Sequence, residues 1–186
     1  MDDTGAAAAW STRANALTLL RLLAAPGLVL AILTGQTVPA SLLVALAVVT
    51  DLADGPVARR FGEATRLGGL LDHAVDATFV TAGSAALAWL GALPAALPPL
   101  IALAFLQYAL DSHLVGSGAL RASFLGRWNG IAYYAAVALP LARDALGLEW
   151  PAPQVVYGLG WLLVASTLVS IADRLRALRA ARRSAP

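Results

Sequence analysis

The chain of 186 residues contains no cysteine and no lysine, and only 13% of its residues are charged. The absence of cysteine excludes disulfide bonds and thiol chemistry. Soluble domains carry about 25% charged residues, so this low charge content excludes an ordinary soluble domain. The residues present are mostly apolar, with 59% hydrophobic and a mean hydropathy of +0.73. The composition indicates a polytopic membrane protein with one domain in the bilayer.

Six apolar runs divide the chain, and each is near the roughly 20 residues that a helix needs to cross a bilayer. They cover about 16–34, 38–58, 68–90, 95–115, 128–146 and 153–172. The pattern predicts an all-α fold, a membrane bundle of six transmembrane helices. We expect a polar N-terminal segment at 1–13, the membrane domain at 14–172 and a basic tail at 173–186. No signal-peptide pattern is recognisable at the start.

The arginines are distributed unevenly between the turns. They occur in the turn between the second and third runs, in the turn between the fourth and fifth, and in the tail. The turns at 35–37 and 91–94 carry no charge. The positive-inside rule therefore predicts cytoplasmic termini for a six-span chain. The small size and the lack of a targeting extension favour a bacterial inner membrane.

Four aspartates lie together inside otherwise apolar sequence, namely Asp51, Asp54, Asp72 and Asp76. Ionisable groups at a membrane boundary are costly and mark functional sites. The spacings of three and four residues place each pair on one helix face. Two such faces side by side make an all-oxygen cage, which suits Mg²⁺ or Mn²⁺. The alternative is that the carboxylates pair with nearby arginines and only lock a helix hairpin.

Residues 51–76 carry the pattern D-x2-D-G-x2-A-R-x8-G-x3-D-x3-D, which resembles the signature of the CDP-alcohol phosphatidyltransferases. Every fixed position and spacing is met, by Asp51, Asp54, Gly55, Ala58, Arg59, Gly68, Asp72 and Asp76. The resemblance implies an enzyme of phospholipid synthesis that transfers a substituted phosphate from a CDP-linked alcohol to a second alcohol and releases CMP. It implies CDP-diacylglycerol as the donor, two divalent cations as cofactors and a homodimer.

The resemblance also implies roles for these residues. Asp51, Asp54 and Asp72 would be metal ligands, and Asp76 would be both a ligand and the general base for the attacking hydroxyl. Gly55, Ala58 and Gly68 share the aspartate faces, where small residues let a nucleotide lie against the backbone. Arg59 would hold a phosphate or fix an aspartate through paired hydrogen bonds.

The acceptor alcohol is less well specified. Family members that use a phosphorylated acceptor often carry S-x-x-G-K-x-K-T before the fifth span. This chain keeps Ser123 and Gly126, has Arg127 at the first lysine and departs from the pattern beyond it. Arg121, Ser123 and Arg127 are the candidate acceptor-binding residues, since arginine binds phosphate well. Glycerol 3-phosphate is the first choice of acceptor, and inositol phosphate, serine or a phosphate-free alcohol are the alternatives.

Several polar residues outside the signature have more than one possible role. Arg21 lies in the first apolar run, where it either reaches an acidic partner or a phosphate or extends to the interface. Gln107 and Asp111 share a helix face and either line an acceptor pocket or, for Asp111, pair with Arg127. His73 is turned away from the aspartate face and is expected to be an ordinary polar residue.

Two other classes of function are weighed against the enzyme. A cation transporter would also place aspartates in a membrane, but such sites lie near the midplane and these lie near one boundary. A catalytically inactive scaffold would not need a complete signature. The basic tail either anchors the last span or forms an interfacial helix that binds anionic lipid head groups. No nucleic-acid partner is expected.

Overall fold

The computed structural model describes residues 13–62, 65–114 and 124–183. Within these ranges the chain forms six α-helices and no strand, so the all-α prediction is confirmed. The helices are α2 (Arg13–Leu33), α3 (Thr37–Arg60), α4 (Arg66–Trp89), α5 (Leu97–Leu114), α6 (Phe124–Ala145) and α7 (Pro153–Arg183). Each contains one of the six apolar runs.

Helix α7 is longer than the last apolar run. It continues through residue 172 to Arg183 and so includes most of the segment 173–186, the expected basic tail. Its residues are mainly arginine, alanine and leucine, which are among the best helix formers, and nothing in the segment breaks the helix.

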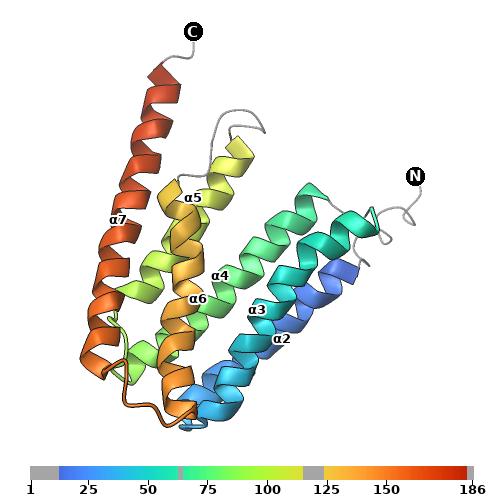
Figure 1. Cartoon of the computed structure of the whole chain (residues 1–186). Coiled ribbons are helices and arrows are strands. Elements are labelled where there is room, and N and C mark those ends of the chain that lie inside the picture. Colours follow the sequence, from blue (N-terminus) through green and yellow to red (C-terminus); the bar gives the residue numbers. More distant parts are fainter. Residues whose placement is uncertain (1–12, 63–64, 115–123, 184–186) are drawn as a thin grey trace.

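The helices run up and down in sequence, with α2, α3 and α4 side by side and α5, α6 and α7 beside them (Figure 1). Five residues, 61–65, separate α3 from α4 in the sequence. Gly62 adopts a left-handed φ of 67° just after α3 ends, a conformation that glycine adopts without strain. Thr65 then caps α4, because its side-chain oxygen accepts a hydrogen bond of 2.9 Å from the backbone nitrogen of Gly68. Helix α2 packs against both α3 and α4, and this packing brings the two halves of the aspartate signature together.

Small residues allow the helices to approach closely in the core. Gly83 of α4 faces Leu28 of α2 and Val137 of α6, and a Cβ added to it would lie 3.0 Å from atoms of both side chains. Leu28, Phe79 and Val137 are almost fully buried around this crossing. The close crossing of α2, α4 and α6 fixes the position of α2 next to the aspartate-bearing hairpin.

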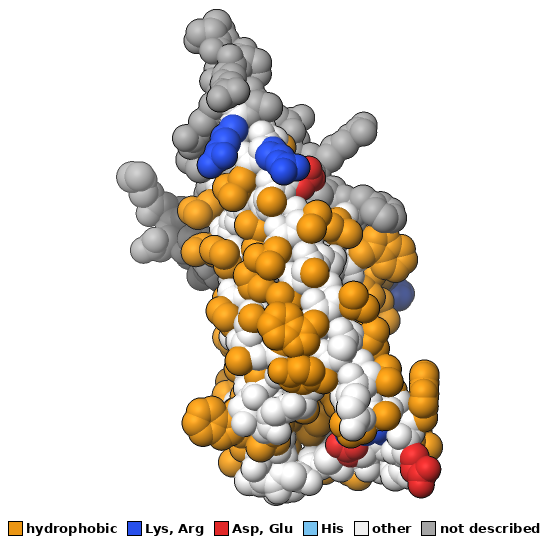
Figure 2. All heavy atoms as spheres, turned by 90° about the vertical axis from the view of Figure 1, so that its left-hand side faces the viewer, with side chains coloured by type: hydrophobic (Ala, Val, Ile, Leu, Met, Phe, Trp, Pro, Cys, Tyr) orange, Lys and Arg blue, Asp and Glu red, His pale blue; other side chains and the backbone are white. Residues whose placement is uncertain are grey.

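The outer surface is apolar. Figure 2 shows the face formed largely by α7, with hydrophobic side chains over its middle, arginines beside an acidic side chain towards one end, and further acidic side chains at the other. In the described residues, three segments are long and apolar enough to cross a membrane: Ala16–Leu33, Thr37–Arg60 and Pro153–Ala177. Helix α5 supplies a shorter apolar stretch, Leu97–Leu110. This is the surface of an integral membrane protein.

The described arginines are also distributed unevenly along the bundle axis. Helix α2 begins and α7 ends at the end of the bundle where α3 turns into α4 (Figure 1), and Arg59 and Arg60 lie at that turn. At the opposite end, Arg143 is paired with Asp144, with 2.6 Å between Nε and Oδ1. The asymmetry expected from the sequence is therefore present in the fold.

Candidate active site

The four signature aspartates converge at one point in the bundle. Asp51 and Asp54 come from α3, and Asp72 and Asp76 come from α4. All four carboxylates contact the same guanidinium group, that of Arg21 on α2. Asp54 is the most deeply placed of them, at 5% exposed. The helical spacing therefore brings the four expected metal ligands together.

Arg21 is fully buried at the centre of this cluster, with 0% of its surface exposed. Its Nη1 donates to Asp51 Oδ1 at 3.2 Å and also to Asp76 Oδ1. Its Nη2 donates to Asp54 Oδ2 and Asp72 Oδ1. Of the two interpretations left open by the sequence, the acidic partner is confirmed and extension to the interface is wrong. The sequence signal for this contact was a single arginine inside an apolar run.

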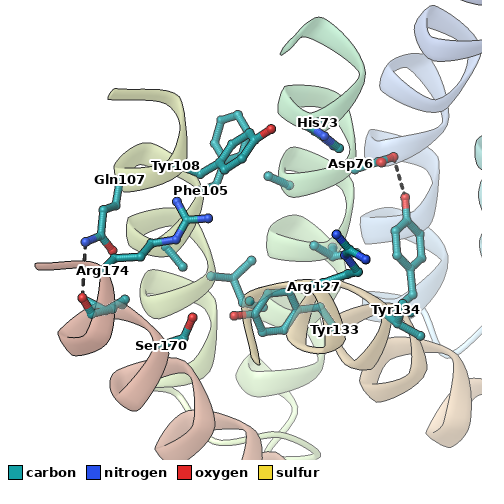
Figure 3. Close-up of a pocket in the computed structure, with 18 of the residues that line it drawn as sticks. His73, Asp76, Phe105, Gln107, Tyr108, Arg127, Tyr133, Tyr134, Ser170 and Arg174 are labelled. Carbon is teal, nitrogen blue, oxygen red and sulfur yellow. Dashed lines mark hydrogen bonds between the residues drawn. The ribbon is translucent and has the colours of Figure 1, made fainter. Parts of the chain in front are cut away.

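Two neutral side chains also contact the carboxylates. Thr18 lies one turn before Arg21 on α2, and its hydroxyl donates to Asp54 Oδ2 at 3.4 Å and lies 3.5 Å from Asp72 Oδ1. Tyr134 of α6 donates a hydrogen bond of 2.8 Å to Asp76 Oδ1 (Figure 3). Both contacts come from helices outside the signature, so sequence spacing gave no indication of them.

The donor set fits a divalent cation of the hard type. All four aspartates offer carboxylate oxygens, the ligands that Mg²⁺ and Mn²⁺ take. Asp54 Oδ1 is buried and has no hydrogen-bond partner among the described residues. A buried carboxylate oxygen without a partner is costly, and a bound cation would satisfy it.

His73 lies closer to this cluster than the sequence analysis expected. One ligand atom from each of Asp72, His73 and Asp76 lies within 4.8 Å of the others. The reason is that His73 and Asp76 are three residues apart and are therefore neighbours on the helix surface. The imidazole ring also meets the ring of Tyr108 edge-on, with 5.3 Å between the ring centres.

The expected nucleotide-binding residues lie along α3 and at the start of α4. Arg59 is exposed near the end of α3 and folds back over Gly55. A Cβ added to Gly55 would lie 3.3 Å from Arg59 Nη1. Ala58 and Gly68 are half-buried. Gly55 and Arg59 thus lie side by side on α3. The space left by the missing side chain of Gly55 is next to the guanidinium of Arg59.

A cavity of about 510 Å³ opens beside the aspartate cluster, between α4, α5, α6 and α7. Asp51 and Asp76 lie at its edge, so it is continuous with the cluster. Figure 3 shows Asp76, His73, Tyr108, Arg127, Tyr134 and Arg174 around it. Most of the remaining lining is apolar.

Two arginines give the cavity its positive charge. Arg127 comes from the start of α6, and Arg174 comes from α7. The guanidinium carbon of Arg174 lies 5.1 Å from the centre of the Tyr108 ring, a cation–π contact. Gln107 also lines the cavity, and its Nε2 donates to the backbone oxygen of Ile171 at 3.3 Å.

The expected acceptor-binding residues are only partly placed. Arg127 lies in the cavity, whereas Arg121 and Ser123 fall outside the described residues, as does the side chain of Asp111. Arg174 was not predicted as a cavity residue, because it lies in the expected basic tail at 173–186. Its place in the cavity depends on how α7 packs against α5, which the signature does not encode.

Comparison with known proteins agrees with this arrangement of a membrane-embedded carboxylate site beside a cavity. Residues 11–172 match the family of CDP-alcohol phosphatidyltransferases, and the chain belongs to that family. It is similar to two proteins named probable phosphatidylglycerophosphate synthase, from Mycobacterium tuberculosis strains CDC 1551 / Oshkosh and ATCC 25618 / H37Rv. Each is 39% identical over 87 residues, which cover 44% of this chain and 42% of the relative. The match thus spans less than half of these relatives. No solved structure matches the chain.

Proposed function

We propose that the protein transfers a phosphatidyl group from CDP-diacylglycerol to a small alcohol and releases CMP, as an enzyme of phospholipid synthesis. The observation that carries the proposal is the position of Asp76. Its carboxylate belongs to the convergent aspartate cluster and also lies at the edge of the arginine-containing cavity. The Asp76 carboxylate can therefore contact both a donor bound at the cluster and an acceptor bound in the cavity.

In this proposal Asp51, Asp54, Asp72 and Asp76 hold two divalent cations, Mg²⁺ or Mn²⁺. The bound cations would neutralise charge that develops on the leaving phosphate. Support comes from the all-oxygen donor set and the unsatisfied Oδ1 of Asp54. Metal ligation lowers a carboxylate's basicity, so Asp76 would act as a base through its position more than through its intrinsic basicity.

The transfer itself is a displacement at phosphorus. Asp76 accepts the proton of the acceptor hydroxyl, and the hydroxyl oxygen attacks the phosphorus that carries the diacylglycerol. A new phosphate ester bond forms as the diphosphate bond breaks, and CMP leaves. Tyr134 donates to Asp76 Oδ1 and so fixes the orientation of this carboxylate. Gly55, Ala58, Arg59 and Gly68 would contact the cytidine diphosphate part of the donor.

Glycerol 3-phosphate is the proposed acceptor. Arg127 and Arg174 give the cavity two guanidinium groups, which suit a phosphorylated alcohol. The name of the two Mycobacterium tuberculosis relatives supports the same choice. Inositol phosphate would fit the same charges, whereas serine or a phosphate-free alcohol would leave the arginines without a phosphate to bind.

The membrane arrangement belongs to the same proposal. All six helices would cross the bilayer, with both termini and the aspartate cluster on the cytoplasmic side of a bacterial inner membrane. The clustering of arginines at the end of the bundle where α3 turns into α4 supports this orientation. The homodimer stays a prediction from the family resemblance.

An acceptor panel tests the proposal. The purified protein in liposomes is given CDP-diacylglycerol and either Mg²⁺ or Mn²⁺. Each reaction also contains one acceptor: glycerol 3-phosphate, inositol phosphate, serine or a phosphate-free alcohol. CMP release is measured. We expect release with glycerol 3-phosphate. Release only with another alcohol would keep the reaction and overturn the acceptor. No release with any acceptor, from protein shown to be folded, would contradict the proposed activity.

A further inference from the structure

The position of Arg21 in the middle of the proposed cation site raises a question of charge. The two terminal nitrogens of its guanidinium each contact two aspartates, and the side chain is fully buried. The guanidinium therefore occupies the point on which the four carboxylates converge.

Four carboxylates cannot remain close together in an apolar bundle without a compensating positive charge. Removing one partner of a buried ion pair leaves an uncompensated charge and is strongly destabilising. Among the described residues, Arg21 is the cation that contacts all four of them. Through these contacts Arg21 links α3 to α4 at the site.

The same contacts conflict with metal binding. Asp54 Oδ2, Asp72 Oδ1 and Asp76 Oδ1 are already engaged by the guanidinium. A Mg²⁺ ion takes its oxygen ligands at about 2.0–2.1 Å, so a cation bound to these carboxylates would lie close to the guanidinium nitrogens. Like charges at such separations also repel strongly in a site of low dielectric.

We propose that Arg21 is the built-in counter-cation of the metal-free site and that divalent cations displace it from the aspartates. Arg21 is then a positioning residue: it keeps the four ligands together before the cations enter, and it competes with them for the same four carboxylates. The inference rests on the proposed function to the extent that the cluster binds divalent cations.

The test compares Mn²⁺ binding and thermal stability of the purified full-length protein in detergent. Free Mn²⁺ is followed by its paramagnetic resonance signal, and unfolding is followed with either EDTA or Mn²⁺ present. The variants are Arg21→Met, which removes the charge, and Arg21→Lys, which keeps it but contacts fewer oxygens. Arg143→Met is the matched control, because Arg143 is paired with Asp144 at the opposite end of the bundle.

We expect Arg21→Met to bind Mn²⁺ at least about tenfold more tightly than the wild type, since a competing positive charge is gone. In EDTA the same variant should unfold at a lower temperature, because the carboxylates have lost their counter-ion. The Mn²⁺ affinity of Arg21→Lys should lie between those of the wild type and Arg21→Met. Arg143→Met should bind Mn²⁺ like the wild type. Only a competing role moves affinity and metal-free stability in opposite directions.

Other outcomes separate this inference from the proposed function. Equal or weaker Mn²⁺ binding by Arg21→Met would overturn the inference and leave the cation site standing. Absence of Mn²⁺ binding by the wild type and every variant would overturn both. If Arg21→Met folds only when Mn²⁺ is present throughout purification, the inference is supported. If it folds under neither condition, Arg21 is needed beyond the metal-free state and the inference is wrong.

Discussion

Replacing Arg174 by glutamine should weaken binding of a phosphorylated acceptor and leave binding of the donor unchanged. The guanidinium of Arg174 lines the cavity and lies over the ring of Tyr108, so a phosphate there would be partly shielded from water. A hydrogen bond to a charged group contributes about 1.5–3 kcal/mol. Because Arg174 is only half-buried, we expect an effect near the lower limit, about tenfold in kcat/KM for glycerol 3-phosphate.

The assay is CMP release in liposomes, with glycerol 3-phosphate and CDP-diacylglycerol varied in turn. The loss should appear as a higher KM for glycerol 3-phosphate. Arg176→Gln is the matched control, because Arg176 is exposed on the same helix and does not line the cavity. An unchanged KM for glycerol 3-phosphate in the Arg174 variant would refute the reasoning. An equal rise in both KM values would show a general disturbance of the site instead.

Three further predictions follow from other contacts. Tyr134→Phe removes the 2.8 Å hydrogen bond to Asp76 and should lower kcat about three- to tenfold, with little change in KM. An unchanged kcat would show that this hydrogen bond does not orient the base. Gly160→Ala places a Cβ 2.4 Å from Pro94 Cδ and should destabilise the protein by about 1–3 kcal/mol, measured as a lower unfolding temperature in detergent. Gly158→Ala is its control, because a Cβ there meets nothing within 4 Å, and equal effects of the two would contradict the packing argument. Chelation with EDTA should abolish CMP release, and added Mg²⁺ or Mn²⁺ should restore it; activity that persists in EDTA would argue against a metal-dependent reaction.

The sequence predicted the helices well because apolar length and charge spacing are local properties. The six apolar runs correspond to the six helices of the described chain, and the aspartate spacings placed each pair on one face. Helix α7 ends later than the last apolar run. Membrane hydropathy predicts where a helix leaves the bilayer, and α7 continues as a helix beyond that point.

Contacts between distant helices could not be predicted in the same way. Arg21 was recognised as unusual, but its contact with all four aspartates depends on the close crossing of α2 with α4 at Gly83. Tyr134 and Arg174 look like ordinary residues of their helices in the sequence. Only the packing of α6 and α7 places Tyr134 against Asp76 and Arg174 in the cavity that Asp76 borders. His73 was set aside on helical register, although it is three residues from Asp76.

The most direct test of the central claim compares CMP release by the wild type and by Asp76→Asn. Both proteins are given CDP-diacylglycerol, glycerol 3-phosphate and Mg²⁺, and both are shown to be folded by their unfolding temperatures. Asp173→Asn serves as the control, since Asp173 is exposed on α7. We predict that Asp76→Asn loses at least about 10²-fold in rate, because a general base contributes that much, while the control retains activity. A folded Asp76→Asn that releases CMP at the wild-type rate would contradict the account.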